Sequence, residues 1–366
     1  MARMHNFSAG PAVLPLSVVE QLSAALPDFQ GCGLGLMELS HRSKTFDAVI
    51  CSAQDRFRSL LGIPDDYAVL FLQGGASLQF YMSVLNLLGP DESVDYLMTG
   101  TWSTKALKEA RRCCDAEPIW EMEGTPDRVP SSGSYTMRSQ AKVLHYTSNN
   151  TIYGTQFDAL PESDGRPLIG DLSSDIASRP VDVSRHAVIY AGAQKNLGPS
   201  GVCAVILSPW AVEQSQRSGA LRPGGIPSML SYDLMVKKGS MFNTPNTFGI
   251  YALDRVLAWV EDMGGVEAMT TRNTEKADML YAELDRTGFW RPHAQKDSRS
   301  QMNITWRTPS AELDTAFVAE ALEAGLSGLK GHRSVGGIRA SIYNACEPES
   351  IQALVSFMQE FERKNG

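Results

Sequence analysis

The chain has 366 residues, 43% of them hydrophobic and 20% charged, a composition typical of a globular protein of about two domains. It excludes a mainly disordered, collagen-like or coiled-coil chain. Because 41 acidic side chains oppose 33 basic ones, the net charge is −8, which argues against a general nucleic-acid-binding protein. A local basic pocket for a small anion is still compatible with this charge.

The N-terminal residues and the cysteines indicate the cellular compartment of the protein. The N-terminus contains no sustained apolar segment, so we expect no secretory signal, and no stretch reaches the roughly 18 apolar residues of a membrane span. The six cysteines form no C-x-x-C pair, and the six histidines lack zinc-site spacing. We therefore predict a cytoplasmic protein with free thiols, no metal site, and no membrane or nucleic-acid partner.

From residue 67 onward, short apolar runs alternate with helical patterns. We predict strands at 67–72, 94–98, 143–147, 167–170, 187–191 and 202–207, with helices at 77–88 and 103–113. A buried helical segment is the alternative for each run, but the short lengths and the flanking Gly, Asp and Pro favour strands. The alternation predicts an α/β fold with a mostly parallel sheet flanked by helices.

The pattern changes after residue 248. We expect helices at 250–261 and 266–287, a strand at 302–306, a helix at 312–324, a strand at 338–343 and a terminal amphipathic helix. These elements predict a large domain over residues 14–255 and a smaller α+β domain over 256–366. We expect residues 1–13 to pack near the smaller domain.

Ligands of open α/β sheets bind at the carboxyl ends of the strands, so the residues after each predicted strand are candidates for a site. The first strand is followed by Gln73-Gly74-Gly75-Ala76-Ser77, which opens a helix whose N-terminal N–H groups suit an anion. A plain tight turn is the alternative. Neither a P-loop nor a complete dinucleotide-binding fingerprint is present in the sequence.

Three further strand ends carry polar or aromatic candidates. Trp102 follows the second strand and is either a core anchor or a stacking partner for a flat ligand. Thr151 lies in a polar cluster that either donates hydrogen bonds or makes a turn. Asp171 either caps a helix or faces a cationic ring nitrogen.

Lys195 lies in a glycine-rich loop between two apolar strands. Burial there would lower the pKa of its amine and suit Schiff-base chemistry, whereas a surface lysine is the alternative. Together the five strand ends supply an anion cradle, a flat aromatic side chain, hydrogen-bond donors, a carboxylate and an amine. Pyridoxal phosphate is one ligand that uses all five.

Nine segments in order carry a resemblance to a known family. They are NFSAGPA (6–12), LSHRSK (39–44), LQGGASLQF (72–80), GTWS (100–103), NNTIYGTQF (149–157), DLSSDIASRPVDVS (171–184), YAGAQKNLGPSG (190–201), FNTPNTF (242–248) and GHRSVGGIRASIYNA (331–345). Over nearly its whole length the sequence resembles the phosphoserine aminotransferase family. These are class-V, fold-type-I pyridoxal-phosphate-dependent enzymes.

The resemblance implies one pyridoxal 5'-phosphate per subunit, attached covalently to Lys195, which also transfers the substrate proton. It implies that Asp171 keeps the ring nitrogen protonated and that Trp102 stacks on the ring. The remaining cofactor contacts would come from Thr151 near the 3-hydroxyl group, from Ala76, Ser77 and Gln194 at the phosphate, and from Asn243 and Thr244 of a neighbouring subunit. The family match therefore implies a homodimer with shared active sites.

For the substrate, the resemblance assigns the α-carboxylate to Arg339. It assigns the phosphate or distal carboxylate to His41, Arg42, His332 and Arg333, because planar bidentate donors bind such anions well. Surface ion pairs are the alternative role for these arginines. Some members of the family have Arg where this chain has Ser77. How the four basic residues share the contacts to the substrate phosphate therefore stays open.

The implied reaction transfers the amino group of L-glutamate to 3-phosphohydroxypyruvate, giving O-phospho-L-serine and 2-oxoglutarate in serine biosynthesis. Action on 4-phosphohydroxythreonine in pyridoxine biosynthesis is a further hypothesis. The alternatives are a glyoxylate aminotransferase, a cysteine desulfurase using Cys346, and a non-catalytic paralogue. Residues 121–140 match no motif and are expected to be a surface excursion.

Overall fold

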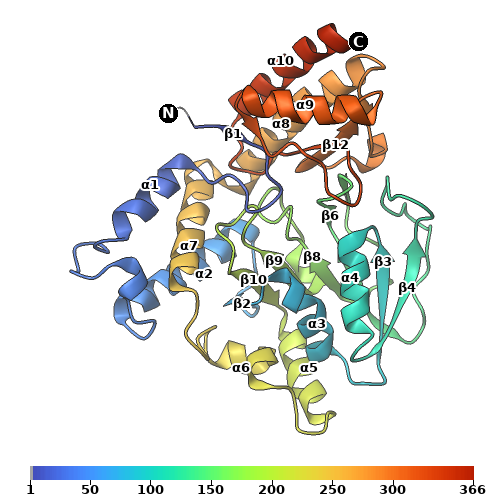
Figure 1. The fold of residues 1–366 in the computed structure, drawn as a ribbon. Coiled ribbons are helices and arrows are strands. Elements are labelled where there is room, and N and C mark those ends of the chain that lie inside the picture. Colours follow the sequence, from blue (N-terminus) through green and yellow to red (C-terminus); the bar gives the residue numbers. More distant parts are fainter. Residues whose placement is uncertain (1–2) are drawn as a thin grey trace.

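In the computed structural model, which describes residues 3–366, a seven-stranded sheet forms the centre of the larger part of the chain (Figure 1). In spatial order its strands are β2 (Ala68–Leu72), β10 (Cys203–Leu207), β9 (His186–Gly192), β8 (Leu168–Asp171), β5 (Ala141–Thr147), β3 (Ser93–Met98) and β4 (Asp115–Glu121). Strand β10 is antiparallel to both neighbours, and the other pairs are parallel. The predicted α/β fold with a mostly parallel sheet is confirmed.

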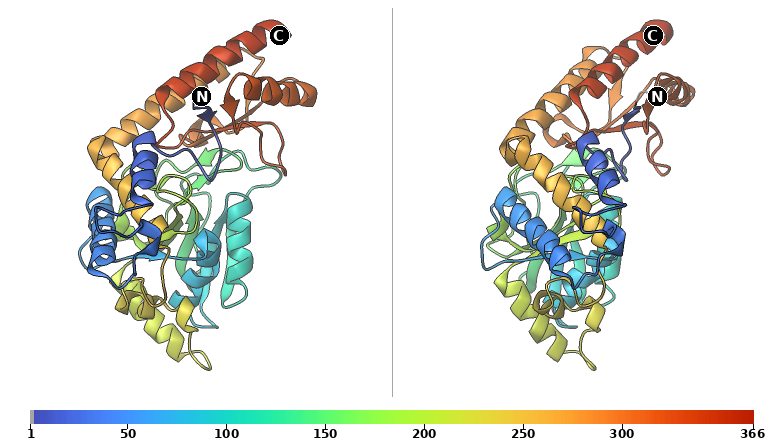
Figure 2. Two further views of the ribbon diagram at one scale, coloured as in Figure 1. Left: turned by 60° about the vertical axis from the view of Figure 1, so that its left-hand side comes forward. Right: turned by 90° about the vertical axis from the view of Figure 1, so that its left-hand side faces the viewer.

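Side chains alternate along the strands and give the sheet two apolar faces. In β2, Val69 and Phe71 enter one core, whereas Leu70 and Leu72 enter the other. Helices cover both faces (Figures 1 and 2). The first face is covered by α1 (Leu16–Ala25), α2 (Lys44–Leu61) and α7 (Thr247–Asp262), and the second by α3 (Gly75–Leu87), α4 (Thr101–Ala110), α5 (Pro209–Ala220) and α6 (Tyr232–Lys237).

The strand directions position the site. Because β10 alone runs against the others, the carboxyl ends of β2, β3, β5, β8 and β9 lie at the same edge of the sheet. The small domain lies next to this edge (Figure 1). A short hairpin of β6 (Asn149–Asn150) and β7 (Thr155–Gln156) follows β5 there.

The small domain is built on a three-stranded sheet of β11 (Arg291–Pro292), β12 (Asn303–Arg307) and β14 (Ile338–Ser341). Its helices are α8 (Gly265–Arg286), α9 (Ala311–Glu323) and α10 (Pro348–Asn365). Strand β1 (His5–Asn6) pairs with β13 (Leu326–Ser327), and Phe7 belongs to the core of this domain. Residues 1 and 2 belong to the segment 1–13 that we expect to pack near the small domain, but they lie outside the described residues.

The expected domain boundary at residue 255 lies inside helix α7. Val256 and Leu257 of α7 pack in the same core as α2, whereas Ala277 and Leu280 of α8 pack in the core of the small domain. We therefore propose that the division falls within α8. The apolar periodicity of a helix shows which of its faces is buried, but it does not show which core that face meets.

The segment between β4 and β5 has neither helix nor strand over residues 122–140. It is nevertheless anchored at several points. Arg138 pairs with Asp95 at 2.6 Å and with Asp115 at 2.9 Å, and the backbone N–H of Gln295 donates to the carbonyl of Asp127 at 2.9 Å. The segment thus connects the edge of the large sheet with the small domain.

Lys276 on α8 is fully buried, and its ammonium group donates to three backbone carbonyls that follow β14. The distances are 3.0 Å to Ile342, 2.8 Å to Tyr343 and 3.1 Å to Cys346. We expect Lys276→Met to lower the free energy of unfolding by roughly 3 kcal/mol, because it leaves buried acceptors without donors. Denaturant unfolding measures this change.

The control is Lys296→Met, at a side chain that is 82% exposed and that should change stability by less than about 0.5 kcal/mol. Equal stability of the two variants would show that the carbonyls find other donors.

Within residues 3–366, no helix is both long enough and apolar enough to cross a membrane. In the same range, no cluster of three or more His, Cys, Asp or Glu side chains has the arrangement of a metal site. All six cysteines are free.

Candidate active site

The residues after five predicted strands meet at one cavity. Its lining includes a residue from each strand end: Ala76 and Ser77, Trp102, Thr151, Asp171, and Gln194 and Lys195. These positions are far apart in the sequence and come together because the strands that precede them run in the same direction. The cavity lies where the topology of an open α/β sheet places a ligand.

The N-terminus of α3 forms the anion-binding side of the cavity. Gly74 precedes the helix with φ +86°, and a Cβ atom there would lie 2.5 Å from the side chain of Leu78. Only glycine allows this close turn. It brings Ala76 and Ser77 to the cavity wall, at the end of the helix whose first N–H groups lack partners within the helix.

Lys195 is the amine of the site. Its Nζ atom donates to the Oγ1 atom of Thr151 at 2.7 Å. Burial lowers the pKa of Lys195 to about 8, although the carboxylates of Asp171 and Asp175 act in the opposite direction. An amine with this pKa is partly neutral near physiological pH and can act as a nucleophile or a base.

Asp171 is the carboxylate of the site. It ends strand β8 with 5% exposure, and its Oδ1 atom accepts the backbone N–H of Ser173 at 3.0 Å. Burial is the largest influence on the pKa of this carboxyl group and raises it, whereas the charge of Lys195 lowers it. In the described part of the chain, no salt bridge involves Asp171. A cationic group of a ligand would therefore compensate its charge.

Trp102 is the flat aromatic side chain of the site, in the first turn of α4. Gly100 just before it has φ +150°, and a Cβ atom there would lie 2.1 Å from the side-chain nitrogen of Asn150. The indole Nε1 of Trp102 and the Oγ1 of Thr147 are buried without a hydrogen-bond partner among residues 3–366. Such atoms are uncommon in folded proteins, and both belong to residues that line the cavity.

Basic side chains of the small domain lie next to this cavity. Arg339 on β14 donates to the carbonyl of Thr151 at 3.1 Å, and its Nε atom is buried with no hydrogen-bond partner in the part of the chain that the structure describes. Burial lowers the pKa of Arg339. The pKa of His332 is also lowered, first by burial and then by the charges of Arg339, Arg333 and Lys105. These influences on His332 come from positive charges that lie close together.

Seven predicted site residues do not line the Lys195 cavity within one chain: Arg339, His332 and Arg333 of the small domain, and His41, Arg42, Asn243 and Thr244. His41 and Arg42 line a separate surface cavity together with Lys238 and Met241. Asn243 lines a third cavity, and the carbonyl of Thr244 accepts a hydrogen bond from Gln73 at 2.8 Å.

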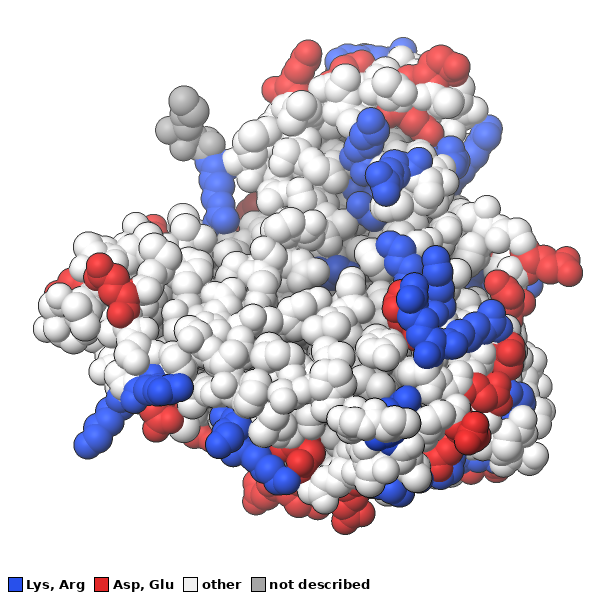
Figure 3. Space-filling view, turned by 60° about the horizontal axis from the view of Figure 1, so that its bottom comes forward, with Lys and Arg blue, Asp and Glu red and all other residues white. Residues whose placement is uncertain are grey.

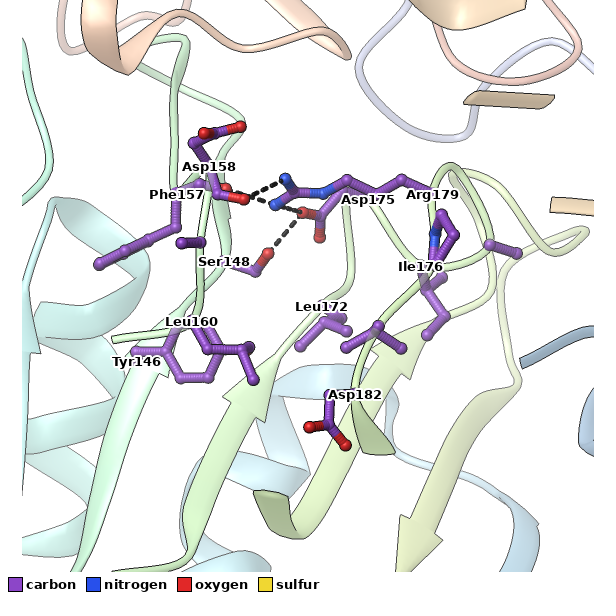
Figure 4. A pocket seen from close by; sticks show the side chains of 14 residues that line it. Tyr146, Ser148, Phe157, Asp158, Leu160, Leu172, Asp175, Ile176, Arg179 and Asp182 are labelled. Carbon is purple, nitrogen blue, oxygen red and sulfur yellow. Dashed lines mark hydrogen bonds and ion pairs between the residues drawn. The ribbon is translucent and has the colours of Figure 1, made fainter. Parts of the chain in front are cut away.

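A further cavity lies beside the segment after β8 (Figure 4). Its buried carboxylate, Asp175, accepts hydrogen bonds from Ser148 and, at 3.2 Å, from Gln156. Arg179 lies 3.5 Å from Asp175 and donates to the carbonyl of Asp158 at 3.0 Å. Because these groups largely bind one another, we interpret the cluster as support for the neighbouring site.

Phe80 is one cavity residue to which sequence reasoning assigned no role. It lies three positions after Ser77 on α3, so helical spacing alone places both on one face and could have found it. The site also includes Asn149, Ser173 and Ser174, which the sequence showed only as polar strand ends. Ser173 accepts the N–H of Gly192 at 3.2 Å, and Asn149 donates to Ser174 at 2.9 Å.

The chain is similar to known aminotransferases. The family model Aminotransferase class-V matches residues 4–354. A phosphoserine aminotransferase of Desulfatibacillum aliphaticivorans is 50% identical over 369 residues, covering 100% of this chain and 99% of the relative.

Two solved structures have the same fold at substantial sequence identity. The phosphoserine aminotransferase from Bacillus circulans subsp. alkalophilus has a TM-score of 0.94 and 47% identity, covering 100% of this chain and 99% of the other. A PLP-bound phosphoserine aminotransferase from Trichomonas vaginalis has a TM-score of 0.90 and 36% identity, covering 98% and 100%. The chain belongs to the aminotransferase class-V family of pyridoxal-phosphate-dependent transaminases.

Proposed function

We propose that this protein is a phosphoserine aminotransferase of serine biosynthesis that acts in the cytoplasm. It transfers the amino group of L-glutamate to 3-phosphohydroxypyruvate and produces O-phospho-L-serine and 2-oxoglutarate. The observation that carries this proposal is the meeting of Lys195, Asp171 and Trp102 at one cavity with the basic group around Arg339 next to it. Similarity to phosphoserine aminotransferases at about half identity supports the choice of substrate.

The residues of the cavity fit pyridoxal phosphate. The N-terminus of α3, Ser77 and Gln194 would hold its phosphate, and Trp102 would stack on its ring. The buried carboxylate of Asp171 suits a protonated ring nitrogen, and Lys195 would hold the cofactor covalently. When bound, the cofactor supplies an electron sink that stabilises negative charge at the substrate α-carbon.

The side chains of this chain perform the remaining tasks. The amine of Lys195, oriented by Thr151, would carry a proton from the α-carbon of the amino acid to the cofactor, and in the second half-reaction it would carry a proton in the opposite direction. Arg339 would hold the α-carboxylate with its guanidinium group, whose buried Nε atom has no partner among the described residues. His332 and Arg333 would bind the phosphate of one substrate and the distal carboxylate of the other.

We further propose a homodimer with shared sites. His41, Arg42, Asn243 and Thr244 lie away from the Lys195 cavity of their own chain, which suits a role in the site of a neighbouring subunit. Large apolar side chains are exposed in the segment before His41: Leu16, Val19, Leu26, Leu34 and Met37. Exposed apolar groups of this size are typical of an interface.

Mixing two inactive variants tests the shared site. Lys195→Ala and Arg42→Ala subunits, refolded together, should recover activity, because one site of each heterodimer would contain both side chains. Two Lys195→Ala subunits provide the control without recovery. If each site were built from one chain alone, the mixture would stay as inactive as its components.

The pH dependence of cofactor attachment follows from the pKa of Lys195. Only the neutral amine attacks an aldehyde, and burial lowers the pKa from 10.5 to about 8. We expect the rate at which the cofactor-free protein captures pyridoxal phosphate to rise with pH, with a midpoint near 8. The accompanying absorbance change measures the rate, and Lys195→Ala should show none of it. A midpoint near 10.5 would contradict the proposed environment.

A coupled assay tests the substrate. In the reverse direction, we expect O-phospho-L-serine with 2-oxoglutarate to react with a kcat/KM at least roughly 10²-fold above that of L-serine, because the serine hydroxyl leaves the cationic groups unpaired. Equal rates would reject the phosphorylated substrate but not the transaminase chemistry. The same assay with 4-phosphohydroxythreonine tests the second substrate, and inactivity would remove that hypothesis.

The alternatives are less well supported. A cysteine desulfurase needs a reactive thiol, yet Cys346 is buried between β14 and α10 and burial raises its pKa to about 11. A non-catalytic paralogue would not need the complete set of Lys195, Asp171 and Trp102. Sulfide release from cysteine would support the desulfurase, and absence of bound-cofactor absorbance would support the paralogue.

A further inference from the structure

Lys105 is a basic side chain near the site to which no role has been assigned. It lies on α4, three positions after Trp102, so both side chains lie on one face of the helix. The Nζ atom of Lys105 lies over the Trp102 ring, 4.5 Å from its centroid. Trp102 lines the Lys195 cavity, so Lys105 contacts a side chain of the cavity wall.

No carboxylate neutralises Lys105 in the described part of the chain. The carboxylate one turn further along α4, Glu109, pairs instead with Arg112 at 3.1 Å. Burial lowers the pKa of His332 in the small domain, and the charges of Arg339, Arg333 and Lys105 lower it further. Figure 3 shows basic side chains gathered over the region of α4 and others on the small domain above it.

We propose that Lys105 contributes to recognition of the substrate phosphate, as a cation supplied by the large domain opposite His332 and Arg333 of the small domain. This inference rests on the proposed function. A phosphate carries −1.5 to −2 charges near neutral pH and can accept hydrogen bonds from several donors at once. A flexible lysine can reach such a ligand as a point charge, without the fixed geometry that a bidentate arginine requires.

The two domains would both supply cations to the substrate phosphate, and this affects the specificity for phosphorylated substrates. A doubly charged group can attract cations from α4 and from the segment before β14 together, whereas an uncharged hydroxyl group cannot. Lys105 should therefore affect the phosphorylated substrate much more than its unphosphorylated analogue. It should leave the chemical step at Lys195 unchanged.

Variants of the holoenzyme test this proposal. For Lys105→Ala, we expect the KM for O-phospho-L-serine to rise about tenfold, with kcat and the kinetics with L-serine nearly unchanged. Lys105→Arg should restore most of the affinity. Lys108→Ala removes the same charge from the next turn of α4, where the side chain is also exposed, and should behave like the parent protein.

Calorimetric titration with inorganic phosphate gives a second readout, independent of turnover. Lys105→Ala should weaken phosphate binding to the holoenzyme about tenfold, and Lys108→Ala should not. Equal behaviour of the two variants would overturn the proposal. The proposal would also be overturned if Lys105→Ala lowered the activity equally with O-phospho-L-serine and with L-serine and changed the absorbance of the cofactor, because Lys105 would then act by orienting Trp102.

The proposed function has a separate test. A parent enzyme that does not distinguish O-phospho-L-serine from L-serine would reject the proposed function, while the phosphate titration would still decide the role of Lys105.

Discussion

Replacing Lys195 by alanine is expected to lower kcat for transamination by roughly 10³-fold or more, because it removes both the covalent anchor and the proton-transferring base. Lys195 lines the cavity, and its Nζ atom donates a hydrogen bond to Thr151 at 2.7 Å. The coupled assay with O-phospho-L-serine and 2-oxoglutarate measures the loss. The absorbance of covalently bound cofactor should disappear in the same variant.

The matched control for this experiment is Lys296→Ala, since that lysine is 82% exposed and lies in the small domain. Its activity should equal that of the parent protein. If Lys195→Ala still turned over and still showed the absorbance of attached cofactor, another amine would have to be the anchor. Circular dichroism and the unfolding midpoint should be close to those of the parent, which separates loss of chemistry from loss of fold.

Replacing Asp171 by asparagine is expected to lower kcat by roughly 10²–10³-fold, because the neutral amide no longer stabilises positive charge on the ring nitrogen. The amide oxygen can still accept the N–H of Ser173, so the end of β8 should keep its structure. The measurement combines the coupled assay with the absorbance spectrum of the bound cofactor. Both should change together.

A measurement of unfolding distinguishes a role of Asp171 at the ring nitrogen from a role in stabilising the fold. Burial raises the pKa of Asp171, so the protein bears a cost for keeping this carboxylate ionised. We therefore expect the cofactor-free Asp171→Asn protein to unfold at the same denaturant concentration as the parent or a higher one. Asp164→Asn, at a side chain 82% exposed, is the control for activity. A stable variant with full activity would exclude Asp171 as the partner of the ring.

Strong apolar runs made much of the fold predictable from sequence. Strands β2, β3, β5, β8, β9 and β10 all coincide with expected runs to within two residues at each end. Strand β4 was not expected, because it lies at the sheet edge and its sequence DAEPIWE has exposed and half-buried positions instead of a continuous apolar run. Helix α2 was also not expected, although its buried residues follow helical spacing.

Some residues of the candidate site could likewise be proposed from the sequence, whereas others could not. Residues that directly follow a strong strand, such as Asp171 and Lys195, could be proposed from the sequence because parallel strands end at one edge. Phe80 lies inside a helix and Lys105 beyond the first turn of another, so their contribution depends on how those helices pack against the sheet. The positions of His41 and Arg42 relative to a complete site depend on a second subunit, which the fold of one chain does not contain.

The sequence by itself determined the fold class, the strand ends that carry the chemistry, and the resemblance to one family, because local apolar patterns and short motifs encode these features. Tertiary structure alone decided which core each part of α7 and α8 joins, and which charges lie near one another. The reversed direction of β10 and the burial that lowers the pKa of Lys195 both depend on contacts between residues distant in sequence. Local propensity does not encode such contacts, because they form only when the elements pack together.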